Sequence, residues 1–317
     1  MIVTASCPLR ISLVGGSTDH PEFLKKYGRG SVISFPCDLR TYSTIHKDVF
    51  GSNSLNSNYV LNYSRREEVD TVIEIQNELI RNCFLDLDVE EINLFFTSDV
   101  YSSGSGLASS SAYLMSLIKA VYEMRGREIL DIELCQKAMQ IERIFNPLVG
   151  QQDFYGSLGG LKRINFSNDC TPSFKYLSTQ IFEDMGIFLL RTGIVRSSTD
   201  VLKSINVDNS VPLLIDVDNL ELAIETCDPE LFHTTINQTW INKKYTSPKI
   251  CENSELIELD RTLLEDERIL SHKLLGAGNG GYFLLFTGKK DDRSLYKDYP
   301  MIRKIEISNY GIQTVKL

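Results

Sequence analysis

The chain has 317 residues with ordinary apolar and charged fractions, which suits one large or two ordinary soluble domains. Its net charge of −9 argues against nucleic acid as the main partner, and no apolar run is long enough to span a membrane. Its seven cysteines are scattered without a C-x-x-C pair, which argues against zinc and redox motifs and fits a reducing cytoplasm. No signal peptide precedes the first expected strand, so we expect a cytoplasmic protein.

The N-terminal part of the chain alternates short apolar segments with polar turns. Apolar residues between Val69 and Ile80 recur at helical spacing and predict a helix over 67–83. The other elements expected here are strands at 2–5, 10–14, 32–35 and 41–45, a turn at 15–19, a short helix at 21–27 and a polar loop at 51–58.

A glycine- and serine-rich loop, Ser103–Ala112, is the most informative part of the sequence. An expected strand at 92–97 precedes it, and apolar residues from Leu114 to Val121 follow at the spacing of a buried helix face. This order is typical of a phosphate site, because glycines let backbone N–H groups close on an anion and the helix N-terminus adds partial positive charge. A flexible connection capped by Ser109 or Ser110 is the alternative. The loop has neither the Gly-Lys-Ser/Thr of a Walker A motif nor the third glycine of a protein-kinase loop.

The remainder predicts a second α+β unit from Phe174 onward. Strands and helices do not alternate regularly, which disfavours a doubly wound sheet. We therefore expect a two-layer α+β fold, with an N-terminal domain at 1–180, a C-terminal domain at 181–317 and a cleft between the two. The expected elements are helices at 132–145, 217–227, 229–242 and 254–267 and strands at 161–166, 187–191, 282–286, 305–307 and 313–315.

Three segments combine into a recognisable set of motifs. They are Cys7-Pro-Leu-Arg-Ile-Ser-Leu-Val-Gly-Gly-Ser-Thr-Asp19, the Ser103–Ala112 loop, and Lys273-Leu-Leu-Gly-Ala-Gly-Asn-Gly-Gly281. In this order they resemble the signature motifs of the GHMP kinases, the family of galactokinase, homoserine kinase, mevalonate kinase and phosphomevalonate kinase. The resemblance covers most of the chain. It implies the two-domain GHMP fold, an active site in the cleft, ATP bound to the N-terminal domain and Mg²⁺ as a cofactor.

The resemblance assigns roles around the ATP phosphates. Glu142 matches the Mg²⁺-binding carboxylate of the family, and Asp153, eleven residues on, matches the base that accepts the substrate hydroxyl proton. Ser110 matches the Mg²⁺-ligating serine, and Arg10 matches a cation that keeps Asp153 ionised and stabilises the γ-phosphate. The alternatives are a solvated helix carboxylate for Glu142, a turn residue for Asp153 and a structural ion pair for Arg10. The residues expected at the nucleotide are Gly104, Ser105, Gly106, Leu107, Ala108, Ser109, Ser110 and Ser111.

The third motif is expected to support this loop from below. The resemblance implies that Gly276, Gly278 and Gly280 let the motif pack under the phosphate loop, and that Gly281 starts a strand.

The first motif points to a sugar as the phosphoryl acceptor. Its turn ends in Thr18-Asp19, as in galactokinase, where the Asp bonds sugar hydroxyls; Gly16, Thr18, Asp19 and His20 are the residues expected at the sugar. The chain most closely resembles bacterial D-glycero-D-manno-heptose 7-phosphate kinases, which phosphorylate the anomeric 1-hydroxyl. A cationic pocket for the substrate's own phosphate is then expected, and its candidates are Arg191, Arg196, Lys243 and Lys244, with Arg196 preferred.

Three positions depart from the family pattern. His20 replaces an apolar residue and could contact the sugar or cap the next helix, Asn279 replaces a glycine, and Ser102 replaces a proline. None of these changes removes a catalytic group.

Other functions remain open at this stage. A kinase for another hexose or modified sugar is the alternative within the family. A decarboxylase of the diphosphomevalonate type shares the fold, but the Thr-Asp turn argues against it. A non-catalytic relative that only binds sugar or nucleotide would need a lost Asp or phosphate loop. The expected partners are ATP and a small sugar or sugar phosphate, without nucleic acid or membrane, and the expected state is a monomer or homodimer.

Overall fold

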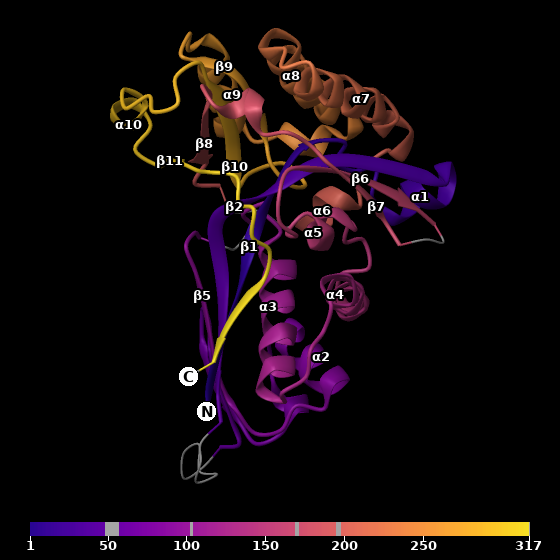
Figure 1. Ribbon diagram of the computed structural model, residues 1–317, viewed down its shortest axis with the longest axis vertical. Helices are drawn as coiled ribbons and strands as arrows, with labels where there is room; N and C mark the ends of the chain where they lie inside the picture. The colour runs from indigo at the N-terminus through magenta and orange to yellow at the C-terminus, as the bar shows by residue number, and fades with distance from the viewer. Residues whose placement is uncertain (48–56, 102–103, 169–170, 195–197, 317) are drawn as a thin grey trace.

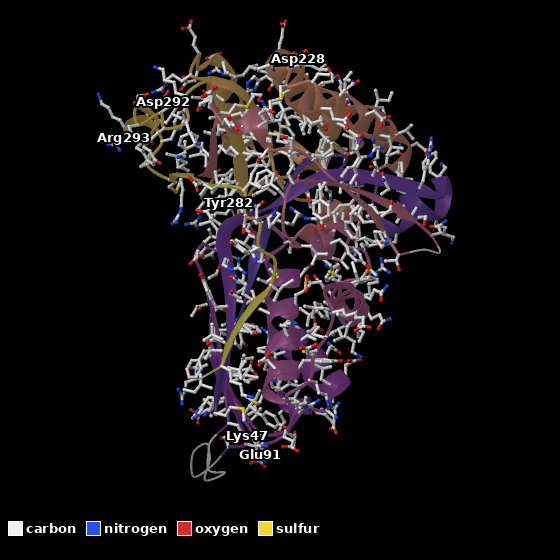
Figure 2. The ribbon with its side chains drawn as sticks, in the orientation of Figure 1. Lys47, Glu91, Asp228, Tyr282, Asp292 and Arg293 are labelled. Carbon is white, nitrogen blue, oxygen red and sulfur yellow. The ribbon has the colours of Figure 1, made fainter. Side chains whose placement is uncertain are left out.

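The computed structural model describes residues 1–47, 57–101, 104–168, 171–194 and 198–316. Two sheets with packed helices form the lower and upper halves of an elongated molecule (Figure 1). Lys47 and Glu91 mark the lower end, Asp228 lies at the upper end, and Tyr282 lies near the junction (Figure 2). In the described ranges, no helix combines the length and the apolar character needed to cross a membrane.

The first sheet is built on two long antiparallel strands, β1 and β2. The strands follow the order β12-β1-β2-β5-β3-β4, and β6 joins β2 to β7. Every pairing is antiparallel except that of β3 with β5. The strands are β1 (Ile2–Val14), β2 (Arg29–His46), β3 (Tyr59–Asn62), β4 (Arg66–Val69), β5 (Asn93–Ser98), β6 (Lys162–Ser167), β7 (Ser173–Tyr176) and β12 (Gln313–Lys316).

Strands β1 and β2 are each continuous, whereas the sequence predicts two shorter strands in each place. Pro8 in β1 and Pro36 in β2 suggest interruptions, because proline lacks the N–H that a ladder needs. The ladder instead shifts its register between Pro8 and Arg10. This bulge lets both strands run through their prolines and brings Arg10 opposite Pro36.

Helices cover one face of the first sheet, with α3 packed directly on β1 and β2 (Figure 1). The helices of this half are α1 (Pro21–Tyr27), α2 (Glu78–Leu87), α3 (Ser109–Met124), α4 (Asp131–Phe145) and α5 (Gln152–Tyr155).

The helix expected over 67–83 is wrong in its first half. That stretch holds the end of β4 and a 3₁₀ turn, Val72–Glu74, and α2 begins only at Glu78. The Glu74 side chain caps the 3₁₀ turn by accepting the Thr71 backbone N–H. The Asn77 side chain caps α2 by accepting the Ile80 N–H at 3.2 Å. These polar caps end one turn and start a new helix. The apolar residues that recur across the caps therefore do not lie on a single helix.

The second sheet has the order β11-β8-β10-β9 and is antiparallel throughout. Its strands are β8 (Gly186–Arg191), β9 (Ile269–Leu274), β10 (Tyr282–Thr287) and β11 (Ile302–Lys304). The helices of this half are α6 (Ser198–Leu202), α7 (Pro212–Glu225), α8 (Pro229–Thr246), α9 (Ser254–Glu265) and α10 (Leu295–Asp298), with 3₁₀ turns at Gln180–Phe182, Val207–Ser210 and Pro248–Cys251. The strand expected at 305–307 is wrong, because β11 ends at Lys304 and Ile307 forms only an isolated bridge to Cys37.

Strand β8 is buried on both faces, and its residues alternate between two cores. Ile187 and Leu189 belong to the main core that is shared with the first half, whereas Phe188 and Leu190 belong to a second core under α8 and α9. Strand β10 alternates in the same way, which explains its unbroken apolar sequence.

The last strand returns to the first sheet. β12 pairs with β1, so Lys316 lies opposite Val3 and the two termini are close together (Figure 1). The overall architecture confirms the expected α+β class with two halves. The boundary between residues 180 and 181 stays a prediction.

Candidate active site

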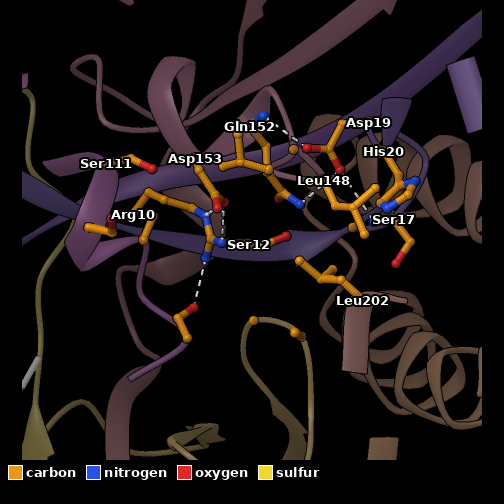
Figure 3. Close-up of a pocket in the computed structure, with 18 of the residues that line it drawn as sticks. Arg10, Ser12, Ser17, Asp19, His20, Ser111, Leu148, Gln152, Asp153 and Leu202 are labelled. Carbon is orange, nitrogen blue, oxygen red and sulfur yellow. Dashed lines mark hydrogen bonds and ion pairs between the residues drawn. The ribbon is translucent and has the colours of Figure 1, made fainter. Parts of the chain in front are cut away.

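A cavity of about 180 Å³ lies where the two halves meet. Its walls come from β1 and the following turn, the Gly104–Ser111 loop, the ends of α4 and α5, α8, and the segment after β9. Figure 3 shows Arg10, Ser12, Asp153, Gln152 and Asp19 along one wall. Segments from both halves thus enclose one site.

The Gly104–Ser111 loop leads into the N-terminus of α3, as the sequence predicts. Gly104, Gly106 and Ala108 all have positive φ, and α3 begins at Ser109. The Ser105 and Ser109 hydroxyls share a 2.8 Å hydrogen bond. The first turn of a helix leaves backbone N–H groups without intrahelical partners, which suits an anion. Ser102 and Ser103 lie outside the described residues.

Leu107 is the one residue of this loop segment whose side chain turns into the main core, where it is fully buried. Its carbonyl accepts the Arg10 N–H at 3.3 Å. Leu107 therefore anchors the loop to β1, and its side chain does not line the cavity.

The third motif packs closely against the phosphate loop. A Cβ on Gly106 would lie 2.6 Å from the Leu275 carbonyl oxygen, and a Cβ on Gly281 would lie 2.5 Å from the Ser105 carbonyl oxygen. Gly276 also approaches Gly106, as expected. The expectation for Gly278 is wrong, because this residue packs on Ile250 instead.

Asn279 explains one departure from the family pattern. Its φ of 57° is left-handed, a conformation that asparagine tolerates. The side chain accepts the Asn253 N–H at 3.2 Å and donates to Glu252 at 3.1 Å. Asparagine thus serves where glycine was expected and adds hydrogen bonds.

Arg10 and Asp153 form an ion pair at the centre of the cavity (Figure 3). Nε and Nη2 of Arg10 donate to Oδ1 of Asp153 at 3.1 and 2.5 Å, and Nη1 donates to the Gly106 carbonyl at 2.9 Å. Both bonds end on Oδ1, so among the described contacts Oδ2 is left for another donor. The pair joins the turn that carries Asp153 to the phosphate loop.

Glu142 is buried beside the first turn of α3. It accepts the Ser111 hydroxyl at 2.6 Å and the Asn146 amide at 3.4 Å. Burial raises the pKa of Glu142 to about 7, the Ser111 hydrogen bond lowers it, and the nearby Asp153 charge raises it further.

The residues around Glu142 fit a hard cation. In the described part of the chain no lysine or arginine pairs with this carboxylate, and Ser110 also approaches it. Hydroxyl and carboxylate oxygens beside a phosphate loop are the donors that Mg²⁺ prefers. Ser110 and Glu142 could therefore hold the ion together with nucleotide phosphates.

The turn after β1 builds a second polar wall. Asp19 is buried and accepts the backbone N–H of Gln152 at 2.9 Å, the Gln152 side-chain amide at 3.0 Å and the Ser17 N–H at 3.3 Å. Burial and then the Asp153 charge raise its pKa. Gly16 lines the cavity. Thr18 does not, because its hydroxyl bonds the Gly15 and Ser31 carbonyls at 2.8 Å and holds the turn instead.

His20 has one of the two roles that the sequence leaves open, the helix cap, and its contact with the sugar stays a prediction. Its Nδ1 accepts the Glu22 N–H at 3.3 Å and so caps α1. Its Nε2 is buried at the cavity and has no hydrogen-bond partner among the described residues. Burial lowers the pKa of His20. The ring therefore caps α1 and leaves one nitrogen at the cavity without a partner in the described part of the chain.

The four cations expected for a substrate phosphate lie in different places. Lys243 lines the cavity and contacts the Ser17 hydroxyl. Lys244 does not reach it, because one residue further along α8 it turns to Asp260 at 2.9 Å and to the Trp240 ring. Arg191 does not reach it either, because it stacks on Tyr101 with 4.3 Å to the ring centroid. Arg196 lies outside the described residues.

The structure adds residues that the sequence analysis did not select. Gln152 and Ser12 line the cavity with Asp19, and Lys273 also lines it, with its ammonium donating to the Ser12 and Leu13 carbonyls at 3.0 and 2.6 Å. Burial, and then the charges of Lys243 and Arg10, lower the pKa of Lys273 to about 7. A lysine directly before Leu274 and Leu275 was the available signal.

Several polar atoms at the cavity lack partners within the described chain. They are Ser12 Oγ, His20 Nε2, Asn146 Oδ1 and Gln152 Oε1. Buried polar groups are almost always hydrogen-bonded, so atoms left open in one cavity indicate a polar ligand there. A polyhydroxylated molecule offers donors and acceptors for all four.

Comparison with protein families gives a match over about a third of the chain. The model of the GHMP kinases N terminal domain matches residues 59–160, which include the phosphate loop, Glu142 and Asp153.

Relatives are similar along the whole chain. The D-glycero-alpha-D-manno-heptose 7-phosphate kinase of Campylobacter jejuni is 24% identical, with 99% of each chain covered. A crystal structure of a D-glycero-D-manno-heptose 1-phosphate kinase from Bacteroides thetaiotaomicron superposes with a TM-score of 0.79 at 18% identity, covering 99% of each chain. Lactococcus lactis galactokinase complexed with galactose gives 0.75 at 15% identity, covering 100% of this chain and 95% of the other.

Proposed function

We propose that this chain is an ATP-dependent kinase of the GHMP type that acts on the anomeric 1-hydroxyl of a sugar phosphate, because residues 59–160 match the GHMP kinases N terminal domain and the Campylobacter jejuni relative is similar along the whole chain. We propose D-glycero-D-manno-heptose 7-phosphate as the substrate. Support for this sugar comes from the 24% identical Campylobacter jejuni relative, which matches over 99% of its length, and from the Thr18-Asp19 turn.

One observation carries the proposal. A single cavity brings together the phosphate loop, the Arg10–Asp153 pair and the polar wall of Asp19 and Gln152. An ATP γ-phosphate at the α3 N-terminus and a sugar on the Asp19 wall would meet at Asp153 (Figure 3). This is the geometry that phosphoryl transfer to a sugar needs.

Asp153 and Arg10 supply the chemistry at the acceptor oxygen. Oδ2 of Asp153 accepts the proton of the sugar hydroxyl as that oxygen attacks the γ-phosphorus. Arg10 holds Asp153 through Oδ1 and places its guanidinium beside the developing negative charge. Mg²⁺, when bound to Glu142 and Ser110, neutralises charge on the β- and γ-phosphates.

The sugar is oriented by the second wall. Asp19 has a fixed carboxylate that can accept sugar O–H groups, and Gln152 Oε1 and Ser12 Oγ offer further acceptors. Lys243, beside Ser17 and His20, binds the phosphate at the far end of the substrate. The wall formed by Asp19, Gln152 and Ser12 therefore recognises the hydroxyl groups of the sugar, and Lys243 recognises the negative charge of its phosphate.

The test is ATP turnover against matched sugars. The panel contains heptose 7-phosphate, the free heptose, mannose 6-phosphate, galactose, L-fucose and mevalonate. We expect the highest kcat/KM with the heptose phosphate, and a product whose new phosphate couples to the anomeric proton in ³¹P NMR. Turnover only with unphosphorylated sugars contradicts the sugar-phosphate assignment but leaves the kinase intact. Release of CO₂ from a mevalonate substrate would instead indicate a decarboxylase.

Two neighbouring lysines provide a matched pair for the phosphate contact. Lys243→Met should raise KM for the sugar phosphate about tenfold or more, the worth of one charge-assisted contact, with little change in KM for ATP. Lys244→Met is the control, because Lys244 pairs with Asp260 outside the cavity. Equal KM values in both variants would exclude Lys243 from phosphate binding.

A further inference from the structure

Strand β6 begins with a lysine in an unusual place. Lys162, Ile164 and Phe166 form the buried face of this strand, and Lys162 is 0% exposed. Buried lysines are normally paired with carboxylates. In the described ranges no carboxylate contacts Lys162, and burial lowers its pKa to about 7.

Three backbone carbonyls take the place of a carboxylate. The ammonium donates to the carbonyl oxygens of Gly156 and Gly160 at 3.3 and 3.2 Å and to that of Leu158 between them. An ammonium group has three N–H bonds, so its donors match these three acceptors. The segment 156–160 is therefore folded around one cation.

This segment directly follows the helix that carries Asp153. Helix α5 has a single turn, Gln152–Tyr155, and its end is closed by the Gly156 N–H on the Gln152 carbonyl at 2.9 Å. A helix of this length is unstable without outside contacts. A cation at its C-terminal end satisfies free carbonyls and favours the helix dipole.

The contact of Lys162 with the carbonyls of residues 156–160, here called the clamp, also affects the surroundings of Arg10. A Cβ on Gly156 would lie 3.2 Å from Cβ of Arg10 and 2.9 Å from the Ser34 hydroxyl, so the backbone of Gly156 rests on β1 and β2. A shift of Gly156 would therefore move Asp153 relative to Arg10 and Gln152 relative to Asp19.

We propose that Lys162 is a positioning residue, which sets Asp153 and Gln152 against the two substrates by clamping the 156–160 carbonyls. The inference rests on the proposed function, in which Asp153 is the base. In the proposed arrangement Lys162 itself touches no substrate, since it does not line the cavity.

The test removes the donors while keeping the length of the side chain. In Lys162→Met we expect kcat to fall roughly tenfold to a hundredfold, as a small misplacement of a reacting group does, with KM for ATP within about twofold. Lys162→Gln, which keeps one amide donor, should lie between Met and wild type. Lys175→Met on the adjacent strand β7 is the control, because that lysine is half exposed and forms only surface ion pairs.

Hydrogen exchange gives a readout that does not depend on activity. Backbone amides of residues 151–160 should exchange faster in Lys162→Met, while those of α3 keep their wild-type rates. If Lys162→Met does not fold, the same comparison is made on Lys162→Gln. Unchanged exchange at 151–160 overturns the clamp, whether or not the wild type proves to be a sugar kinase. A folded variant with loosened 151–160 amides and wild-type kcat overturns the positioning role.

Discussion

At the residue scale, the cavity holds charges of both signs at close range. Among the described residues its carboxylates are Asp19, Glu142 and Asp153, and its cations are Arg10, Lys243 and Lys273. Burial and like charges raise the pKa of Asp19 and Glu142 and lower the pKa of Lys273, so these three groups are pushed toward their neutral forms. A ligand that brings both a metal ion and phosphate relieves both imbalances.

The first prediction concerns the base. Asp153→Asn should lower kcat by roughly 10²- to 10⁴-fold, because Asn can hold Arg10 in place but cannot take the hydroxyl proton. ATP affinity, measured by calorimetry, should stay near wild type. Near-normal turnover in a correctly folded variant would remove Asp153 from this role.

The second prediction concerns Mg²⁺ and pH. Protons and Mg²⁺ compete for Glu142, whose pKa is raised to about 7, so the Mg²⁺ concentration for half-maximal turnover should fall as pH rises from 6 to 8. Glu142→Gln should raise this concentration and flatten its pH dependence. A pH dependence that persists in Glu142→Gln would contradict the assignment.

Substitutions of the two serines near Glu142 distinguish a metal ligand from a residue that only supports the Glu142 carboxylate. Ser110→Ala should raise the Mg²⁺ requirement at every pH, because a ligand is lost. Ser111→Ala should instead move the pH midpoint upward, because the hydrogen bond that favours the ionised carboxylate is gone. If both variants behave alike, Ser110 is not a distinct ligand.

At the element scale, the contact between the third motif and the phosphate loop is made by backbone alone. Gly281 has a φ of 97° and no room for a side chain above the Ser105 carbonyl. Gly281→Ala should therefore lower both the free energy of unfolding, by more than about 1 kcal/mol, and the affinity for ATP. Gly126→Ala is the control, since it has a φ of 65° but nothing within 4 Å of its added Cβ. Equal ATP affinities in the two variants would show that the close packing is not needed.

A second element-scale prediction concerns how α8, α9 and β9 are joined. Burial disfavours the charge on Asp260, but hydrogen bonds from His272, Lys244 and Trp240 outweigh it and lower its pKa to about 2. A carboxylate with a lowered folded pKa stabilises the protein above its ordinary pKa, and this contribution is lost as pH falls from about 4 to 2.

Asp260→Asn should therefore lower the melting temperature most at neutral pH. The difference from wild type should stay nearly constant from pH 7 down to about 4 and should shrink as the pH falls below that. Thermal unfolding across this range decides it, and a difference that grows on acidification would contradict the assigned pairing.

At the scale of the whole molecule, Lys273 joins the two halves across the cavity. It starts in β9 of the second sheet and donates to carbonyls of β1 in the first. Because its pKa is lowered to about 7, much of it is neutral at pH 8, and a bound anion should return a proton to it. Binding of the sugar phosphate without Mg²⁺ should then take up protons.

Calorimetry at pH 8 in buffers of different ionisation enthalpy measures this uptake. Glu142 is already largely ionised at that pH, so it contributes little. Lys273→Met should remove most of the uptake, and Lys244→Met should keep it. Proton uptake that is the same in Lys273→Met would show that Lys273 does not sense the ligand.

The sequence alone determined the features whose signals are local. Motif order and the family resemblance selected the Gly104–Ser111 loop, Glu142 and Asp153 as candidates, and the structure brings them together with Arg10 and Asp19 in one cavity. Local patterns also predicted α1 with its residue bounds and the type of most other elements, because caps and apolar periods act within a few residues.

Only the tertiary structure decided features that depend on distant partners. A bulge between β1 and β2 carries both strands through Pro8 and Pro36, and β12 returns to β1 from the other end of the chain. The same holds for side chains: Lys243 reaches the cavity while Lys244 turns to Asp260, and Lys162 is buried on three carbonyls. Adjacent lysines look alike in a sequence, and their environments differ because packing against remote segments, rather than local propensity, determines which neighbours each one meets.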